Sequence, residues 1–345
     1  MKILITADPE LPVPPILYGG IERIIYSLVS FFVKQGHEVT LCAHPDSQVS
    51  CKLISWKGAQ SQSSLDTFKN MITLTNLIYK ENFDVIHSFS RLAYMTAVLP
   101  TKVPKVMSYQ REPTLSQVKK ALVLSKKDSM IFTGCSNYIT NQLKTVANAQ
   151  TIYNCVPIEL YKYNQNVEPD APLVFLGRIE EIKGTHTAIE VAKITNRRLI
   201  IAGNIPVGQE GYFQEKIKPH LNECVSYVGA VNDKQKSELL GNCLAFLMPI
   251  QWNEPFGIVM AEAMACGTPI LGFPKGSVPE VIEDGVNGFI CNDVNEMVRR
   301  VKDCSQIDRK IVRQIAKERF SIETIAAEYI RLYQYLIQNI KKNKK

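Results

Sequence analysis

The sequence predicts an α/β protein of two doubly wound domains, each with a parallel sheet covered by helices on both faces. Three observations lead to this prediction. A chain of 345 residues is too long for one compact core. Short, continuous apolar runs alternate with segments of helical period, as buried parallel strands and their crossover helices do. The alternation stops at a polar stretch with two prolines at its end, VPIELYKYNQNVEPDAP, and then restarts.

The domain boundaries follow from this restart: a first domain at 1–156, a linker at 157–172, a second domain at 173–321 and a tail at 322–345. In the first domain we expect helices over 21–34, 65–80, 115–124 and 136–146. The expected strands there are KILITA, EVTLCA, DVIHSF, KVMSY, MIFTGC and TIYNCV. Those of the second domain are LVFLGRI, RLIIAG, SYVGAV, AFLMPI, PILGF and GFICN. The last helical segment, 322–341, carries an apolar face that we expect to pack on the body of the protein.

Composition narrows the class of protein. A hydrophobic content of 46% with 21% charged residues is that of a soluble globular chain. The longest apolar runs fall short of the roughly 20 residues that span a bilayer, and MKILITADPE is too short in apolar residues for a signal peptide. Nine cysteines without a CxxC pair argue against a disulfide framework and a zinc site. We therefore expect a cytoplasmic protein.

The net charge of +7 is concentrated in the first domain, because residues 1–155 hold 16 basic and 10 acidic side chains. Patches such as KVPK and KKALVLSKK could face an anionic lipid or a phosphate, so contact with the inner face of a membrane is one interpretation. A solvated lysine-rich surface is the other. Aromatic residues do not interleave with these lysines, so we expect no nucleic acid partner.

The segment EPFGIVMAEAMACGTPI places two carboxylates, Glu254 and Glu262, in an apolar stretch that follows a strand. We expect a helix from Gly257 to Cys266, with Gly267 ending it. Glu254 then precedes the helix, whose first amide groups, near Phe256, attract a phosphate. Carboxylates on either side can accept hydrogen bonds from the vicinal hydroxyls of a sugar. A helix cap and a paired interior acid are the alternative reading of the two acids.

Two further motifs follow strands. LVFLGRIEEIKG places Arg178 directly after a strand and Lys183 before a glycine that opens a helix. Two cations at a strand end suit a diphosphate, since arginine offers a bidentate fork and lysine a mobile charge. ILYGGIER places Gly19 and Gly20 after the first strand, where the backbone can approach a phosphate closely. This Gly-Gly turn is the weaker signal, because it is not GxGxxG.

Together, GGIER, GRIEEIKG and EPFGIVMAE followed by AMACGTPILGFPKGSVPEVIEDGVNGFI resemble family 4 of the retaining, nucleotide-sugar-dependent glycosyltransferases. The resemblance spans the chain and is strongest over 173–291. It implies the GT-B fold: two Rossmann-like domains facing an inter-domain cleft, with the C-terminal helix crossing back to the first domain. It also implies transfer of a sugar from a nucleoside-diphosphate sugar to a hydroxyl acceptor, such as a glycan, a lipid-linked sugar or a small molecule.

The resemblance also implies roles for single residues. Arg178 and Lys183 would neutralise the donor diphosphate, and Glu254 would hold and orient the donor sugar. Backbone amides of residues 256–258, from Phe256 through Gly257 to Ile258, would help to place the sugar and its phosphate. Glu262 would bind the ribose diol of the nucleotide. Gly20, beside Gly19 in the first domain, would bring its amide to the donor phosphate. The nucleobase would lie near Val228. The chain has no DxD motif, in agreement with the family's metal independence, and we expect no cofactor.

Departures from the family gather on the acceptor side. In DVIHSFS, His87 matches the first histidine of the family's DVxHxH stretch, but Phe89 replaces the second, which reaches the donor sugar in relatives. His87 is therefore either a substrate contact or a structural residue. Arg111, in SYQREP where relatives carry another histidine, adds a cation that could bind the acceptor or a phosphate. The family's Asn-Gly is here Asn154-Cys155.

Two other functions stay open at this level. A GT-B epimerase or hydrolase of sugar nucleotides shares the fold but has no need of the two acids around EPFG. A binding protein could retain donor affinity without transfer. Release of nucleoside diphosphate with and without an acceptor separates the three. The base and sugar of the donor, the acceptor and the oligomeric state do not follow from the residues.

Overall fold

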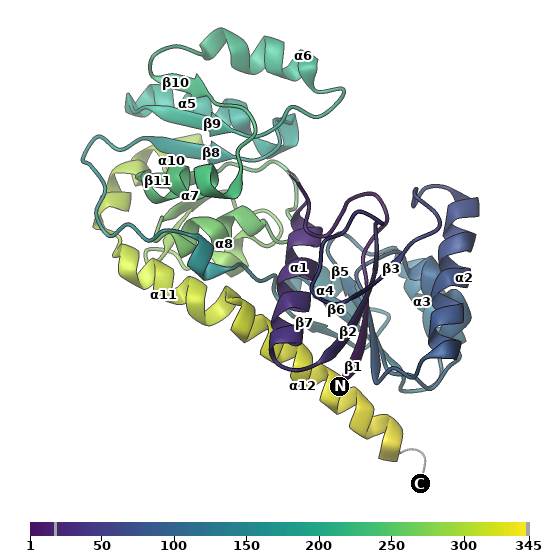
Figure 1. Ribbon diagram of the computed structural model, residues 1–345. Helices are drawn as coiled ribbons and strands as arrows, with labels where there is room; N and C mark the ends of the chain where they lie inside the picture. The colour runs from purple at the N-terminus through teal and green to yellow at the C-terminus, as the bar shows by residue number, and fades with distance from the viewer. Residues whose placement is uncertain (17–18, 343–345) are drawn as a thin grey trace. The chain divides into compact units, whose positions relative to one another are not determined.

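A computed structural model describes residues 1–16 and 19–342 of the protein, which divide into two compact units (Figure 1). Unit 1 combines Met1–Cys155 with the C-terminal segment that begins at Ile322, and unit 2 is Val156–Ser321. Each unit is built on one parallel sheet with helices around it, so the predicted α/β, doubly wound fold class is confirmed. No helix among the described residues is long and apolar enough to cross a membrane.

The sheet of unit 1 has the strand order β3-β2-β1-β4-β5-β6-β7, and every pairing in it is parallel. Its strands are β1 (Lys2–Thr6), β2 (Glu38–Ala43), β3 (Lys52–Ser55), β4 (Val85–Ser88), β5 (Lys105–Tyr109), β6 (Met130–Gly134) and β7 (Ala149–Thr151). The helices are α1 (Gly20–Lys34), α2 (Ser64–Lys80), η1 (Leu92–Val98), α3 (Leu115–Leu124), α4 (Asn137–Lys144) and α12 (Ile322–Lys342). The strand order reverses between β1 and β4, which puts a topological switch point at their carboxyl ends.

Three elements of unit 1 differ from the expectation. The edge strand β3 and the short helix η1 were not predicted, because KLIS has only two apolar residues and LAYMTAV is too short to show a helical period. The last strand ends at Thr151 instead of running to Val156. Val156 leaves the sheet and forms an isolated bridge with Ser321 inside unit 2.

Helix α12 packs on unit 1, as expected for a C-terminal helix that returns to the first domain. Tyr329 and Tyr333 of α12 are buried, and the Tyr333 hydroxyl lies 2.5 Å from Nδ1 of His87. Nε2 of His87 lies 2.6 Å from the Ser108 hydroxyl, which is also 3.2 Å from the Tyr329 hydroxyl. A buried polar network therefore joins the centre of the sheet to α12.

Burial lowers the pKa of His87 from its ordinary value of 6.5 to about 3. Because the unfolded chain binds a proton at this imidazole below pH 6.5 and the folded chain does not, the contribution of His87 to stability is lost as the pH falls from 6.5 towards 3. At pH 5 we expect a loss of about 2 kcal/mol relative to pH 7.

Chemical denaturation of the wild type and of His87→Gln at pH 7 and pH 5 tests this effect. The variant should show a smaller decrease in the free energy of unfolding between the two pH values. His44→Gln, which removes a half-buried histidine of the same unit, serves as the control and should keep the wild-type decrease. Equal pH dependence of wild type and His87→Gln would contradict the assignment.

The sheet of unit 2 has the order β10-β9-β8-β11-β12-β13 and is also entirely parallel. Its strands are β8 (Leu173–Leu176), β9 (Leu199–Ala202), β10 (Val225–Tyr227), β11 (Ala245–Met248), β12 (Ile270–Gly272) and β13 (Gly288–Ile290). Its longer helices are α5 (Thr185–Thr195), α7 (Asp233–Gly241), α8 (Ile258–Ala265), α10 (Val294–Val301) and α11 (Arg309–Phe320). Short helical turns complete it: η2 (Ile158–Leu160), η3 (Glu181–Lys183), α6 (Glu210–Tyr212), η4 (Phe213–Ile217), η5 (Lys218–His220), α9 (Val278–Val281) and η6 (Lys302–Gln306).

The segment 157–172, expected as a linker, is part of unit 2. Ile158 and Tyr161 are buried within this unit. The Arg313 side chain of α11 donates a hydrogen bond to the Tyr161 carbonyl at 2.8 Å. Because the segment is mostly polar, the sequence did not indicate these contacts, which attach it to the rest of unit 2.

Candidate active site

The predicted donor-binding residues gather at the switch point of the unit 2 sheet. The strand order reverses between β8 and β11, which lie side by side, so the loops that follow these two strands meet. The amide of Gln251 donates to the Ile182 carbonyl at 2.8 Å. Gly184 is so close to the other loop that a Cβ there would lie 2.0 Å from the Pro249 carbonyl oxygen. Glycine is therefore required where the two loops touch.

Lys183 and Glu254 form the centre of this site. The Lys183 ammonium lies 2.6 Å from Oε2 of Glu254, and both side chains are mostly buried. The indole of Trp252 donates to the same carboxylate oxygen at 3.1 Å, and the ammonium lies 4.9 Å from the centre of the indole ring. The carboxylate thus sits between a cation and an indole NH, while the cation also faces an aromatic ring.

The backbone around Glu254 is tightly packed. The amide of Ser277 donates to the Glu254 carbonyl at 2.9 Å, and a Cβ at Gly276 would lie 2.3 Å from that carbonyl oxygen. Gly257 has φ of 72°, a left-handed conformation that glycine adopts readily, and it caps the N-terminus of α8. These constraints fix the position of Glu254 just ahead of the first turn of the helix.

Phe256, Gly257 and Ile258 lie where the sequence predicts them, at the start of α8. The Phe256 ring is buried against Phe320, with ring centres 5.5 Å apart. Ile258 is the first residue of the helix and Ala265 the last, with Cys266 as the C-cap and Gly267 in the left-handed conformation after it. The helix and its two ends therefore match the expectation from the sequence.

Arg178 follows β8 and is half-buried. Its guanidinium lies 2.9 Å from Oε1 of Glu180, a side chain that is itself buried. The amide of the preceding Gly177 donates to the Ala202 carbonyl of β9, which ties this turn to the neighbouring strand. Arg178 is thus held at the carboxyl end of the sheet by an ion pair with an acid of its own loop.

Glu262 lies inside α8 and is buried among apolar residues. Its Oε1 accepts a hydrogen bond from the Tyr161 hydroxyl at 2.6 Å and lies 2.5 Å from the Lys236 ammonium. Lys236, on α7, is also buried. Burial raises the pKa of the Tyr161 hydroxyl well above its usual range. Glu262 therefore belongs to an internal ion pair, the structure that the alternative reading of this acid described.

Val228 comes directly after β10 and is half exposed, so the strand is shorter than the predicted SYVGAV. Its amide donates to the Ile201 carbonyl of β9 at 3.0 Å. The Tyr227 hydroxyl donates to the Gly203 carbonyl at 2.8 Å. The turn after β10 is thus fixed to the turn after β9, at the carboxyl edge of the same sheet.

The other predicted residues lie in unit 1. Gly19 and Gly20 stand at the start of α1, as the sequence predicts. The carbonyl of Gly19 accepts the first hydrogen bond of the helix, from Arg23. Leu17 and Tyr18 of the same motif lie outside the described residues.

The structure argues against substrate contact by His87. The side chain is completely buried, and hydroxyl groups of Tyr333 and Ser108 lie against both ring nitrogens. Phe89, which replaces the family's second histidine, is also buried, with its ring centre 4.2 Å from that of His87. The environment assigns His87 to the packing of α12, the structural alternative that the sequence left open.

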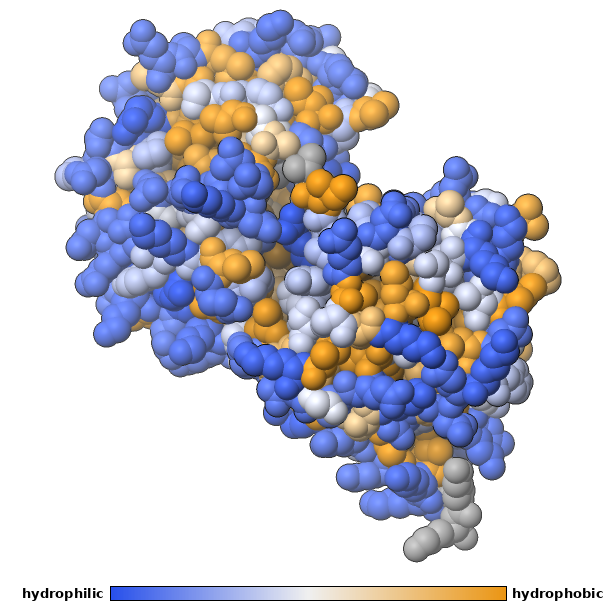
Figure 2. Space-filling model, in the orientation of Figure 1, coloured by the Kyte–Doolittle hydropathy of each residue, from blue (hydrophilic) through white to orange (hydrophobic). Residues whose placement is uncertain are grey.

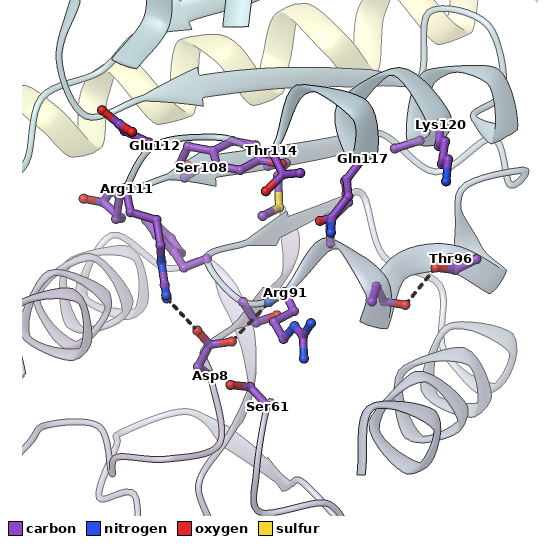
Figure 3. Close-up of a pocket in the computed structure, with 18 of the residues that line it drawn as sticks. Asp8, Ser61, Arg91, Thr96, Ser108, Arg111, Glu112, Thr114, Gln117 and Lys120 are labelled. Carbon is purple, nitrogen blue, oxygen red and sulfur yellow. Dashed lines mark hydrogen bonds and ion pairs between the residues drawn. The ribbon is translucent and has the colours of Figure 1, made fainter. Parts of the chain in front are cut away.

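Unit 1 contains a cavity of about 540 Å³ at its own switch point (Figure 3). Asp8, after β1, and Arg91, after β4, lie on one side of it, and Arg111, after β5, extends towards Asp8. Gln117 and Lys120 reach it from α3. The cavity thus has both polar and apolar lining residues. The apolar ones include Phe89, Leu92, Leu99, Met107 and Leu124.

Both carboxylate oxygens of Asp8, an acid that lines this cavity, contact arginine residues. Its Oδ1 accepts the Arg91 amide at 3.1 Å, and its Oδ2 lies 3.3 Å from the exposed guanidinium of Arg111. Burial raises the pKa of Asp8 to about 6, and the charge of Arg111 opposes this rise. Arg111 therefore lies in the cavity, but its nearest anionic partner is a carboxylate of the protein itself.

Sequence reasoning missed four residues of these sites: Trp252, Lys236, Tyr161 and Asp8. Trp252 stands two residues before Glu254, in QWNEPFG, and it is one of only two tryptophans in the chain, so its position was a usable signal. Asp8 lies just after the first strand, at the carboxyl edge of the sheet, where ligands bind in such folds. Tyr161 and Lys236 gave no signal, because they reach Glu262 only through the tertiary fold.

Comparison with known proteins agrees with this architecture. The model of glycosyltransferase family 4 matches residues 18–160, and that of glycosyl transferases group 1 matches residues 159–319. Spore coat protein SA of Bacillus subtilis (strain 168) is 21% identical over 97% of this chain and 99% of its own. The crystal structure of AviGT4, a glycosyltransferase involved in avilamycin A biosynthesis, has a TM-score of 0.75 at 24% identity and covers 98% of both chains.

A second solved structure was determined with a ligand. Anabaena HepE, crystallised in complex with UDP-glucose, has a TM-score of 0.74 at 18% identity, over 97% of this chain and 100% of its own. Two parallel-sheet units with charged loops at the unit 2 switch point, and two family models matched in tandem, define a glycosyltransferase of the GT-B type. The chain belongs to glycosyltransferase family 4.

Proposed function

We propose that this glycosyltransferase moves a sugar from a nucleoside-diphosphate sugar to a hydroxyl acceptor, with retention of the anomeric configuration and without a metal ion. The observation that carries the proposal is the contact between Lys183 and Glu254 beside Trp252, at the unit 2 switch point and ahead of α8. A cation and a helix N-terminus suit a diphosphate, and the adjacent carboxylate suits the hydroxyls of a sugar. HepE, a protein of similar fold, was solved with UDP-glucose.

The same residues supply the chemistry in this proposal. Breaking the bond between the anomeric carbon and the phosphate oxygen leaves negative charge on the diphosphate and positive charge on the sugar. Lys183 and Arg178 stabilise the departing diphosphate, and this interaction strengthens as the charge develops. The acceptor oxygen bonds to the anomeric carbon on the face that the phosphate leaves, and its proton passes to a phosphate oxygen. Glu254 orients the sugar through its hydroxyls and forms no covalent bond.

The donor's nucleoside is assigned to the edge of the unit 2 sheet. Val228 lies exposed after β10, where a base can contact it. Glu262 is proposed to bind the ribose diol, with Lys236 and Tyr161 holding its carboxylate in place. The acceptor is assigned to the cavity of unit 1, in which Asp8 can accept a hydrogen bond from an acceptor hydroxyl. Gly20 is assigned to the donor phosphate through its backbone amide.

A donor panel tests the function. The protein is incubated with UDP-, GDP- and ADP-sugars, and nucleoside diphosphate release is measured with and without candidate acceptors. Release that depends on an acceptor, with an α-linked product from an α-linked donor, supports retaining transfer. Acceptor-independent release indicates a hydrolase, conversion of the donor to an isomer indicates an epimerase, and nucleotide binding without turnover indicates a binding protein. Each of these last three outcomes refutes the proposal.

Chelation tests the metal independence separately. Because Lys183 and Arg178 would neutralise the leaving diphosphate in place of a divalent cation, we expect EDTA to leave the rate of transfer unchanged. Steady-state rates with EDTA, and with added Mg²⁺ or Mn²⁺, provide the measurement. Strong inhibition by EDTA that Mg²⁺ or Mn²⁺ reverses would show that a metal takes part.

A further inference from the structure

The outer surface of unit 1 carries an apolar stripe on α2 that no other described residue of the unit covers fully. Leu65, Phe68, Ile72 and Tyr79 are between 39% and 74% exposed. Their spacing of three, four and seven residues places them along one side of the helix. The opposite side of α2 buries Leu74, Leu77 and Ile78 against the unit. The core therefore does not account for the exposed stripe, which Figure 2 shows as hydrophobic surface at the outer edge of α2.

A second apolar group lies at the end of α3. Val123 and Leu124 are 86% and 49% exposed. Helix η1 contacts both α2 and α3, so the two helices that carry these apolar groups pack on the same short helix. We call the exposed side chains of α2 and of the α3 end, together with the lysines described next, the α2–α3 surface.

Lysines border these apolar residues. Residues 113–127 include four lysines and no acid: Lys119 and Lys120 on α3, and Lys126 and Lys127 directly after it. All four are exposed. On α2, Lys69 and Lys80 lie beside the stripe, and the acid of this helix, Asp66, pairs with Lys69 at 3.0 Å. Lysines thus border exposed leucine, isoleucine, valine, phenylalanine and tyrosine side chains, and the neighbouring acids are Glu112 and Asp128 at the two ends of this segment and Asp66 on α2.

We propose that the α2–α3 surface docks the protein on the anionic face of a lipid bilayer. Apolar and aromatic side chains of a surface helix enter the boundary between headgroups and acyl chains, while lysines at its border attract anionic headgroups. Phenylalanine and tyrosine are well suited to this depth. A protein partner would explain the apolar stripe, but the four exposed lysines of residues 113–127 match the charge of an anionic phospholipid surface better.

The acceptor cavity adjoins this surface. Lys120 and Leu124 belong both to the α2–α3 surface and to the lining of the unit 1 cavity, and the cavity also takes Ser61 and Gln62 from the turn before α2. Docking through this face would hold the cavity next to the headgroups. An acceptor attached to a lipid could then enter it without leaving the membrane.

Vesicle sedimentation tests docking without any measurement of enzyme activity. The full-length protein is mixed with vesicles of phosphatidylcholine alone or of equal parts phosphatidylcholine and phosphatidylglycerol. We expect binding to the anionic vesicles only, with a bound fraction that falls at high ionic strength. Binding to both kinds of vesicle alike, or to neither, would overturn the proposal.

Two variants separate the apolar and the charged contributions, and both leave the cavity and the donor site untouched. Phe68→Ser with Ile72→Ser, and Lys126→Glu with Lys127→Glu, should each lower the partition coefficient at least about tenfold. Matched controls in unit 2 are Val207→Ser, at a side chain that is 98% exposed, and Lys216→Glu with Lys218→Glu. The controls should bind like the wild type, and equal losses in them would indicate non-specific adsorption.

Two further readouts complete the test. The rise in melting temperature that the donor's nucleoside diphosphate produces should be the same in the α2–α3 variants and the wild type. A failure of docking is therefore distinguishable from a failure of the proposed function. Size-exclusion chromatography detects a second copy on the same surface. A dimer that the Phe68→Ser, Ile72→Ser variant dissociates would replace the membrane with self-association and refute the proposal.

Discussion

Replacing Lys183 with alanine is expected to abolish the rise in melting temperature that the donor's nucleoside diphosphate produces, and to lower the rate of transfer on the order of 100-fold or more. The ammonium is the cation nearest to Glu254, at 2.6 Å, and its loss removes both the charge that attracts the diphosphate and the partner that positions the carboxylate. A selective ligand stabilises the folded protein by mass action, so the shift reports binding directly.

Thermal-shift measurements with UDP, GDP and ADP, followed by steady-state kinetics, provide the measurement. Lys193→Ala is the matched control, because Lys193 is an exposed lysine on α5 of the same unit, beside His220. It should keep the wild-type shift and rate. If Lys183→Ala showed the same shift as the wild type, the diphosphate would have to bind elsewhere.

The second large effect concerns Glu262. Glu262→Ala leaves Lys236 and Tyr161 buried without their acceptor, so we expect the free energy of unfolding to fall by about 3 kcal/mol or more. We also expect nucleotide binding to weaken at least about tenfold, since the carboxylate that would hold the ribose diol is gone. Chemical denaturation and calorimetric titration with the nucleoside diphosphate measure the two effects independently.

A double variant separates stability from binding. Glu262→Met with Lys236→Met replaces the buried pair by apolar side chains of similar size, which should restore most of the stability but not the affinity. Recovery of both properties would show that Glu262 acts only within the structure. Glu254→Gln is expected to show the opposite pattern: it should keep nucleotide binding and mainly lower the rate of transfer.

The sequence predicts best what depends on local order. The strand before Arg178, the helix that Gly184 opens and the α8 segment between Gly257 and Gly267 all lie where their residues indicate, because glycine positions and apolar periods are local signals. The positions of the two acids relative to α8 follow for the same reason. The parallel order of both sheets follows from the alternation of strands and helices.

Partners across the fold could not be predicted in this way. Lys183 and Glu254 were expected to bind different parts of the donor, but their loops meet at the switch point and the two side chains pair with each other. Tyr161 stood in a stretch whose polarity indicated a linker. His87 was left undecided because the two hydroxyl groups at its ring nitrogens come from β5 and from α12, which is far away in the sequence. Such contacts depend on tertiary distances that no spacing encodes.

The division of unit 1 between both ends of the chain bears on the order of events during synthesis. Unit 2 is one continuous stretch, and a ribosome exposes all of it before the last helix emerges. Unit 1 cannot complete its fold at that stage, because Tyr329 and Tyr333 cover the sheet face around His87 only after α12 has been made. The first half of the nascent chain therefore carries an open apolar surface until α12 has emerged, and a message truncated before the α12 codons leaves that surface permanently uncovered.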